Sequence, residues 1–387
     1  MVNHMTMPQE TSAQNPAGFL LNWLEKRKKK EFCAVVMPDF FFDRFVQYPD
    51  NFNSFSRSAL EVVRRKGGSI DNVDQVNFRG GNAANTAAAL ATLGGTVYPI
   101  IETNGLGLAL LKHFLAPLKI NLDYAKTSGR ASLTTALEFQ QDGNKVNLML
   151  RDMGSLVDFG PKSLTSMDYK LLATADVVCV FNWAGTRKHG TELAETVFRY
   201  VKTKGKGVTY YDTADPTPNK EKIPSLVRHV LSRDFVDVLS VNENEAIQYA
   251  SYVNPKYVAT LRKKHQKLEK LALGCAAILA EHLSSRIDLH TTAFSATFNR
   301  NKKPQIATTL PVRMLRATGA GDSWNAGNIY ADQQGLPDKA RLMFANVVAA
   351  YYVSNPKGAH STMSQLKGFL EKLVTGSQPQ EHLPSQE

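Results

Sequence analysis

The sequence has little cysteine and no long apolar run. Its three cysteines, Cys33, Cys179 and Cys275, lie in apolar stretches, which favours buried free thiols over disulfide bonds. No group of cysteines and histidines has the spacing of a zinc site. No apolar run approaches the roughly 18 residues that a membrane-spanning helix needs. Residues 1–18 also lack the basic and then apolar pattern of a secretory signal. We therefore expect a cytoplasmic protein without a membrane partner.

Acidic residues are outnumbered by basic ones. The chain has 46 Lys and Arg against 35 Asp and Glu, a net charge of +11, and much of the excess lies in residues 26–30 and 262–267. Both runs flank amphipathic helical segments, and neither is interleaved with aromatic residues as stacking surfaces for nucleic acids are. The runs therefore indicate solvated helix faces, and we expect no nucleic-acid partner. The positive field would also attract an anionic substrate.

The chain has 387 residues, 43% of them hydrophobic, which suits one large α/β domain with a small appendage, although two domains would also fit. The first part reads as a polar, disordered stretch over residues 1–17, followed by elements in mixed order. These are a helix over 19–30, a strand over 32–37, a helix over 82–93, a strand over 96–101 and a hairpin over 133–139 and 145–150.

The second part alternates strands and helices. We predict strands over 177–181, 207–211, 236–241 and 287–291, and helices over 191–202, 224–232, 243–249, 256–283, 320–334 and 339–353. Crossovers of this length predict a doubly wound, mainly parallel sheet with helices on both faces. The expected organisation is an extension over 1–30, a main domain over 31–374 and a disordered tail over 375–387.

The most informative run is Ala317-Thr318-Gly319-Ala320-Gly321-Asp322, which leads into a helix-compatible stretch. Free backbone N–H groups at a helix start carry partial positive charge, and a Gly-Ala-Gly turn lets a phosphate approach them closely. A carboxylate beside such a turn would repel a phosphate, so Asp322 suits a base that takes a proton from an attacking hydroxyl. The alternative is an ordinary glycine-rich helix start, where the carboxylate only favours the helix dipole. The chain lacks Gly-x-x-x-x-Gly-Lys-Ser/Thr and is therefore not a P-loop enzyme.

This run resembles the C-terminal signature Asp-Thr-x-Gly-Ala-Gly-Asp of the ribokinase-like (pfkB) carbohydrate and nucleoside kinases. Three further segments resemble motifs of that family in the same order: 38–43 with its acidic pair, 79–87 with its di-glycine, and 240–246 with its Asn-x-x-Glu. The resemblance covers residues 33–374. It implies a ribokinase-like fold with a small β lid over 44–78 and 128–152 that covers the substrate.

The resemblance implies transfer of a phosphoryl group from ATP, with Mg2+, to a hydroxymethyl group of a sugar. Nucleosides and sugar phosphates remain alternative acceptors, and a ligand-binding regulator without turnover is the alternative outside the enzymes. Specificity for the acceptor lies in the lid, where we recognise no motif. An exposed lid sheet would also allow a homodimer.

The resemblance also assigns site residues. Asp322 is the expected base, and Gly319, Ala320 and Gly321 form the expected anion hole. The acceptor would be bound by Asp39, Asp43, Gly80, Gly81, Asn82 and Asn85, and the nucleotide by Thr318, Gly319, Gly321, Asn346 and Gly358. Asp212 resembles a further position near the phosphates. Asp39 and Asp43 are expected at the end of the first strand, projecting to one face. Asn82 is alternatively an N-cap.

Asn242 and Glu245 are the expected magnesium pair, because their spacing puts both on one helix face. The same spacing fits a capping box, and both roles are compatible. For Phe40, Phe41 and Phe42 we expect two core residues, with base stacking as the alternative. Arg130 and Arg151 bracket the lid hairpin and are surface residues or contacts to a phosphorylated acceptor.

The chain departs from the family at Arg316-Ala317, where the signature has Asp-Thr. In many members that aspartate helps to hold an activating monovalent cation. Arg316 cannot ligate a cation, but its guanidinium can supply a fixed positive charge in the same place. We therefore expect no potassium requirement.

Overall fold

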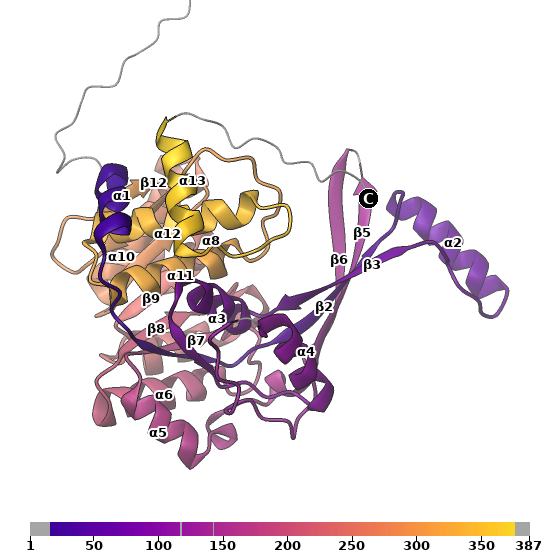
Figure 1. Ribbon diagram of the computed structural model, residues 1–387, viewed down its shortest axis with the longest axis horizontal. Coiled ribbons are helices and arrows are strands. Elements are labelled where there is room, and N and C mark those ends of the chain that lie inside the picture. Colours follow the sequence, from indigo (N-terminus) through magenta and orange to yellow (C-terminus); the bar gives the residue numbers. More distant parts are fainter. Residues whose placement is uncertain (1–15, 117, 142, 376–387) are drawn as a thin grey trace, which may run out of the picture.

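The computed structural model describes residues 16–116, 118–141 and 143–375. Its centre is an eight-stranded sheet in the order β12-β11-β10-β9-β8-β7-β1-β4, in which the strands from β4 to β10 run parallel and β11 and β12 are antiparallel (Figure 1). The strands are β1 (Cys33–Met37), β4 (Thr96–Pro99), β7 (Val177–Phe181), β8 (Val208–Asp212), β9 (Val238–Val241), β10 (Arg286–His290), β11 (Phe294–Phe298) and β12 (Gln305–Thr308). The predicted doubly wound, mainly parallel sheet is confirmed.

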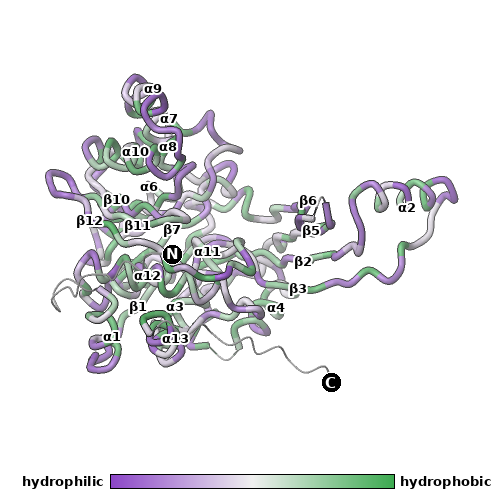
Figure 2. Tube along the Cα trace, turned by 90° about the horizontal axis from the view of Figure 1, so that it is seen from above, coloured by the Kyte–Doolittle hydropathy of each residue, from purple (hydrophilic) through white to green (hydrophobic). Residues whose placement is uncertain are grey.

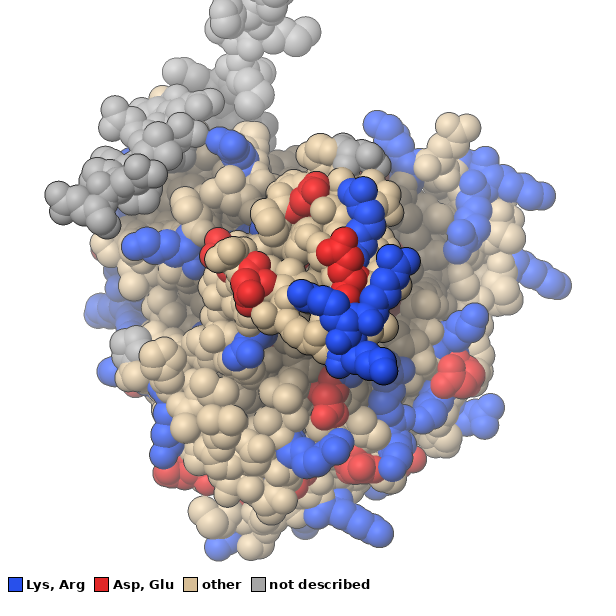
Figure 3. Space-filling model, turned by 90° about the vertical axis from the view of Figure 1, so that its right-hand side faces the viewer, with Lys and Arg blue, Asp and Glu red and all other residues tan. Residues whose placement is uncertain are grey.

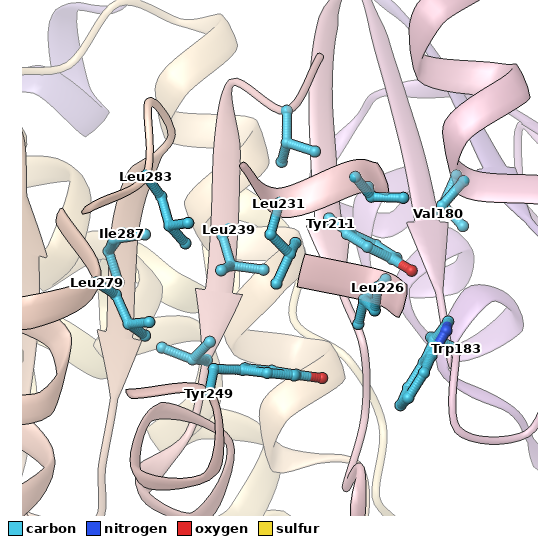
Figure 4. Packing of buried hydrophobic residues seen from close by; sticks show 14 of the residues in the cluster. Val180, Trp183, Tyr211, Leu226, Leu231, Leu239, Tyr249, Leu279, Leu283 and Ile287 are labelled. Carbon is cyan, nitrogen blue, oxygen red and sulfur yellow. The ribbon is translucent and has the colours of Figure 1, made fainter. Parts of the chain in front are cut away.

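Helices cover both faces of this sheet because successive strand side chains point to opposite sides. One face carries α5 (Ser166–Thr174), α6 (Gly190–Lys204), α7 (Ile223–Leu226), α8 (Glu243–Val253), α9 (Pro255–Lys264) and α10 (Leu268–His282). Figure 4 shows part of this core, where Leu239 and Ile287 of the sheet meet Leu231 and Leu279.

The other face carries α1 (Pro16–Lys26), α3 (Asn82–Leu93), α11 (Ala320–Gln333), α12 (Asp338–Ser354) and α13 (Met363–Thr375). Helix α3 is rich in alanine, and nine of its twelve residues are buried. Small side chains let it approach the sheet and α11 closely. A separate small cluster includes residues of α4 (Gly105–Leu115).

A second sheet of four strands leaves the main body. Its order is β3-β2-β5-β6, with β2 (Phe41–Gln47), β3 (Asp74–Gly80), β5 (Ser132–Gln141) and β6 (Asn144–Asp152). Helix α2 (Phe52–Arg64) joins β2 to β3 and projects away from the body (Figures 1 and 2). Seen from that side, the projecting end carries both basic and acidic side chains (Figure 3). We call the second sheet and α2 the lid.

The structure corrects several element boundaries. The single helical region expected over 256–283 is two helices, since the chain leaves the helix between α9 and α10. The helix expected over 224–232 is α7 followed by a π-helical turn, Val227–Leu231. Short 3-10 turns lie at Gly154–Val157, Pro161–Ser163 and Thr217–Lys222. The disorder predicted at the two ends falls mostly outside the described residues. Among the helices that the structure describes, none combines the length and apolarity needed to cross a membrane.

Candidate functional site

The Asp322 carboxylate lies where the starts of helices α3 and α11 meet. Asn82 Nδ2 donates a hydrogen bond to Asp322 Oδ1 at 2.8 Å, and Asn85 Nδ2 donates to Oδ2 at 2.9 Å. The residue is 6% exposed. Burial raises the pKa of Asp322 to about 7, although the two amide hydrogen bonds lower it in part. This carboxyl group therefore exchanges a proton near neutral pH, as a general base should.

A left-handed glycine opens the turn in front of α11. Gly319 has φ +84° and is the N-cap residue of the helix. A Cβ at this position would lie 2.6 Å from the hydroxyl of Tyr352, which donates a hydrogen bond to the Thr318 carbonyl at 3.2 Å. Both the backbone angle and the space thus require glycine. The helix that follows directs its first N–H groups toward the turn, which can hold an anion.

Asp43 presents an oxygen with no partner. Burial raises the pKa of Asp43, while a hydrogen bond with Thr134 and the nearby Arg151 guanidinium lower it in part. Its Oδ1 is buried and makes no hydrogen bond. A Cβ at Gly80 would overlap the carboxylate, so glycine is needed for this packing. A buried acceptor without a donor is suited to a ligand hydroxyl.

Asp39 lies just after the end of the first strand, as expected, but Asp43 does not. We predicted that Asp39 and Asp43 project from the end of one strand, and this is wrong: Asp39 follows β1, whereas Asp43 lies within β2 of the second sheet. Asp39 accepts hydrogen bonds from the backbone N–H groups of Asn82 at 2.9 Å and Ala83 at 2.8 Å, and from Asn182 Nδ2 at 2.8 Å. It therefore anchors the start of α3. Asn182 lies in no motif and was not predicted as part of the site.

Gly81 connects the lid strand β3 to α3. It has φ +94°, and a Cβ there would meet the Asp39 carbonyl at 2.9 Å, so a side chain would push α3 away from Asp39. Phe40 precedes β2 and Phe41 begins it. Both are buried, in agreement with the prediction of two core residues among the three phenylalanines.

Asn242 and Glu245 form the capping box that their spacing allows. The Asn242 N–H donates to Glu245 Oε2 at 2.9 Å, Asn242 Nδ2 donates to Oε1 at 2.8 Å, and the Glu245 N–H donates to Asn242 Oδ1 at 3.0 Å. Burial raises the pKa of Glu245 well above its usual value, and neighbouring Asp212, Asp215 and Glu243 raise it further. A cation bound near these clustered carboxylates would relieve their mutual repulsion. The oxygen atoms of Asn242 and Glu245 therefore fit a magnesium ion held partly through water. Within the described part of the chain, no group of three or more His, Cys, Asp or Glu forms a direct metal site.

Asp212 ends β8 and fastens α11 to the sheet. Asn325 Nδ2 donates to Asp212 Oδ2 at 2.6 Å, and the hydroxyls of Tyr210 and Ser240 both donate to Asn325 Oδ1 at 2.7 Å. The helix that carries Asp322 is thereby held to β8 and β9.

The Arg316 guanidinium lies against the loop before α13. One of its nitrogens donates to the Pro356 carbonyl at 2.9 Å, and its carbon lies 5.9 Å from the centre of the Tyr352 ring. A Cβ at Gly358 would overlap this guanidinium. Asn346 is buried and accepts a hydrogen bond from Trp324 Nε1 at 2.9 Å, so it has a scaffolding role that the sequence did not indicate.

Arg79 and His360 extend the site in a way that the sequence did not reveal. Arg79 Nε donates to Asn85 Oδ1 at 3.1 Å, and its terminal nitrogen lies 3.1 Å from His360 Nε2. Burial lowers the pKa of His360 to about 3 and that of Arg79 to about 10. His360 is therefore neutral and accepts at Nε2. Its ring stacks on Tyr352, with centres 4.9 Å apart. Arg79 lies in the di-glycine segment 79–87, but no motif of the sequence contains His360.

The lid arginines differ in their surroundings. The Arg151 guanidinium lies over the Phe41 ring, 4.8 Å from its centre, on the same side of the lid as Asp43. Arg130 is exposed, and its guanidinium nitrogen Nη2 lies 3.5 Å from Asp152 Oδ1. The structure thus brings Arg151, but not Arg130, into the neighbourhood of the unpartnered Asp43 oxygen.

The fold of the chain is similar to that of several solved kinase structures. No curated protein sequence matches the chain. Among solved structures, Arabidopsis thaliana ribokinase in complex with ribose and ATP is similar, with 17% identity, a TM-score of 0.66 and coverage of 88% of this chain and 99% of that one. Adenosine kinase from Sinorhizobium meliloti has 14% identity, a TM-score of 0.65 and coverage of 89% and 99%. A candidate ribokinase II from E. coli, in complex with ATP and Mg2+, has 13% identity, a TM-score of 0.65 and coverage of 89% and 100%.

These likenesses show a ribokinase-like fold. The family model of the pfkB carbohydrate kinases matches residues 54–365, well over half of the sequence. The chain therefore belongs to the pfkB family of carbohydrate kinases and is a kinase.

Proposed function

We propose that the protein transfers the terminal phosphoryl group of ATP to a hydroxymethyl group of a sugar, with Asp322 as the general base. The observation that carries this proposal is the buried Asp322 carboxylate, held by Asn82 and Asn85 at the start of α11. Its pKa of about 7 lets it accept a proton at neutral pH. The similar Arabidopsis ribokinase is described in complex with ribose and ATP, which supports this pair of substrates.

The acceptor hydroxyl gives its proton to Asp322 as its oxygen bonds to the terminal phosphorus. The bond between that phosphorus and the bridging oxygen breaks, and ADP leaves with the electron pair. Backbone N–H groups at Gly319 and Gly321 stabilise the charge on the transferred group. The Ala320 N–H, which was expected to take part, donates to the Ala317 carbonyl at 3.1 Å and shapes the turn instead. The unpartnered Asp43 oxygen accepts a hydrogen bond from another hydroxyl of the acceptor, which fixes its orientation.

The remaining assignments are parts of the same proposal. Gly80 and Gly81 let the acceptor approach the backbone, and Asp39 acts on the acceptor through α3. Thr318, Gly358 and the surroundings of Asn346 lie along the nucleotide. Asn242 and Glu245 would hold Mg2+, whose charge would neutralise the donor phosphates. The E. coli relative in complex with ATP and Mg2+ supports this requirement.

We also propose that Arg316 replaces a monovalent cation. Its guanidinium donates to the Pro356 carbonyl and lies over Tyr352, next to the anion turn. A fixed positive charge there makes a mobile cation unnecessary. Desalted protein should have the same activity with and without potassium chloride at constant ionic strength. A strong potassium requirement would contradict this assignment.

Lid closure over the acceptor would exclude water and limit ATP hydrolysis. The organisation into an extension over 1–30, a kinase domain over 31–374 and a tail over 375–387 stays part of the proposal, as do a cytoplasmic location and a homodimer through the lid. The edge strand β6 is exposed along its length and offers a surface for such a dimer.

The direct test is phosphate transfer from ATP to a panel of sugars, sugar phosphates and nucleosides, with and without Mg2+. Turnover of a sugar that depends on Mg2+ is the expected result. Turnover of nucleosides alone would move the acceptor to the class of the adenosine kinase neighbour. A preference for sugar phosphates would give Arg151 a role in binding. Ligand binding without any product would instead indicate a regulator and overturn the kinase proposal.

A further inference from the structure

One imidazole beside the anion turn has a buried ring nitrogen without a hydrogen-bond partner. His290 is the last residue of β10, and its Nε2 is buried without a hydrogen bond. The ring edge faces the turn: a Cβ built at Gly321 would lie 3.5 Å from His290 Cε1. A buried polar atom that lacks a protein partner is a place where a ligand completes the hydrogen bonding.

The sheet register places the same ring beside the expected magnesium pair. Parallel pairing aligns Leu289 of β10 with Val241 of β9, so the residues that follow, His290 and Asn242, lie next to each other at the carboxyl edge. His290 therefore lies between the Asn242 end of α8 and the glycine turn of α11. Donor phosphates that reach from one to the other pass this ring.

Neighbouring groups hold the ring in place. His290 stacks on Trp324, with ring centres 4.9 Å apart and planes at 32°. Trp324 Nε1 donates to Asn346 Oδ1 at 2.9 Å, and Asn346 Nδ2 donates to the Thr308 carbonyl of β12 at 3.0 Å. The stacking partner is thereby fixed to the sheet. The Thr292 N–H also donates to Glu243 Oε1 at 3.2 Å, which ties the loop after β10 to α8.

From this geometry we infer that His290 binds a phosphate of the donor nucleotide through an Nε2–H donor. The inference rests on the proposed use of ATP and adds a residue that no motif of the sequence indicated. The ring supplies an N–H donor that is already oriented, so little conformational entropy is lost when the nucleotide binds.

The test compares two substitutions that separate the hydrogen bond from the packing. His290→Phe keeps a ring to stack on Trp324 but has no donor, whereas His290→Gln keeps an amide donor near the position of Nε2. His113→Phe, on α4 outside the site, is the matched control. Binding of ADP with Mg2+ and binding of adenosine are measured by titration calorimetry, and thermal unfolding confirms that each variant is folded.

We expect His290→Phe to weaken ADP binding by about 10- to 100-fold, the loss typical of a hydrogen bond to a charged group. Adenosine binding should not change, and His290→Gln should retain most of the ADP affinity. Unchanged ADP binding in His290→Phe, or equal weakening of ADP and adenosine, would overturn the inference and leave the kinase proposal standing. If the native protein binds no ADP, both are overturned.

Discussion

At the scale of single residues, the site depends on where carboxylates are buried and what they contact. Asp322 has two amide donors, Asp39 has three donors, and Asp43 has an oxygen with none. In the proposed function, the same type of side chain is therefore a base in one place, a helix anchor in another and a ligand contact in a third.

The raised pKa of Asp322 predicts how the rate depends on pH. The base must be ionised, so kcat/KM should fall as the pH drops below about 7 and should level off above it. A pH profile of the native protein that extends well to both sides of this value measures the acidic limb. A limb near the usual carboxyl pKa would contradict the assignment of Asp322.

Asp43 should affect acceptor binding more than nucleotide binding. Asp43→Asn removes a charged acceptor at the unpartnered position, and we expect the KM for the acceptor to rise about 10- to 100-fold. The KM for ATP should change little. The control is Asp74→Asn on β3, because Asp74 is exposed on the same sheet. Equal effects of the two substitutions would remove Asp43 from the acceptor site.

At the scale of elements, close packing of α11 and α12 positions the glycine turn that precedes α11. A Cβ at Gly327 would lie 2.8 Å from the Cα atom of Ala345 and 3.1 Å from the Val348 side chain. Gly327 thus allows the two helices to touch, which stabilises the helix that begins with the anion turn.

Two glycine substitutions test this packing. Gly327→Ala should lower the free energy of unfolding by about 1–3 kcal/mol, because backbone atoms cannot move aside. Gly368→Ala, in α13, has no atom within 4 Å of the added Cβ and should raise stability by up to about 1 kcal/mol. Denaturant unfolding measures both. A loss of stability in Gly368→Ala, or none in Gly327→Ala, would refute the packing argument.

The sequence predicted some elements closely and missed others. The predicted ranges 82–93 and 177–181 coincide with α3 and β7. Helix α2 was missed although its sequence is amphipathic, because residues 44–78 were assigned to a β lid on the family resemblance alone. The antiparallel strands β11 and β12 were also missed. They are short and no helix precedes either of them, whereas the other strands were predicted from their alternation with helices.

The candidate site could be predicted where a motif carries it. Asp322 lies in such a motif, and the structure brings Asn82 and Asn85 to it. Asn182, His290 and His360 lie in no motif, and their proximity to the site depends on tertiary packing alone. The position of Asp43 was misjudged because the chain passes from one sheet to another within four residues.

At the scale of the whole molecule, a buried ionic network joins the sheet to α12. Arg341 is fully buried and donates to Asp288 Oδ2 at 2.9 Å, to Thr297 Oγ1 at 3.0 Å and to Asp338 Oδ1 at 3.0 Å. The guanidinium groups of Arg286 and Arg341 hold the pKa of Asp288 well below its usual value, even though burial raises it.

Removal of one member should destabilise the whole fold. Arg341→Ala leaves Asp288 as a buried charge with fewer partners, and we expect a loss of about 3–5 kcal/mol in the free energy of unfolding. Since the folded pKa of Asp288 is depressed, its stabilisation is present above its unfolded pKa of about 4 and is lost as the pH falls. The difference between native and Arg341→Ala protein in denaturant unfolding should therefore narrow in acid. If the difference in the free energy of unfolding stayed constant as the pH fell below about 4, this would contradict the network account.

The central claim, that Asp322 takes the proton during phosphoryl transfer, is tested most directly by single-turnover transfer from ATP in native protein and in Asp322→Asn. The account predicts that the variant transfers phosphate at least about 100-fold more slowly, while it binds ADP with nearly native affinity and remains folded. A variant that transfers phosphate at close to the native rate would contradict the claim.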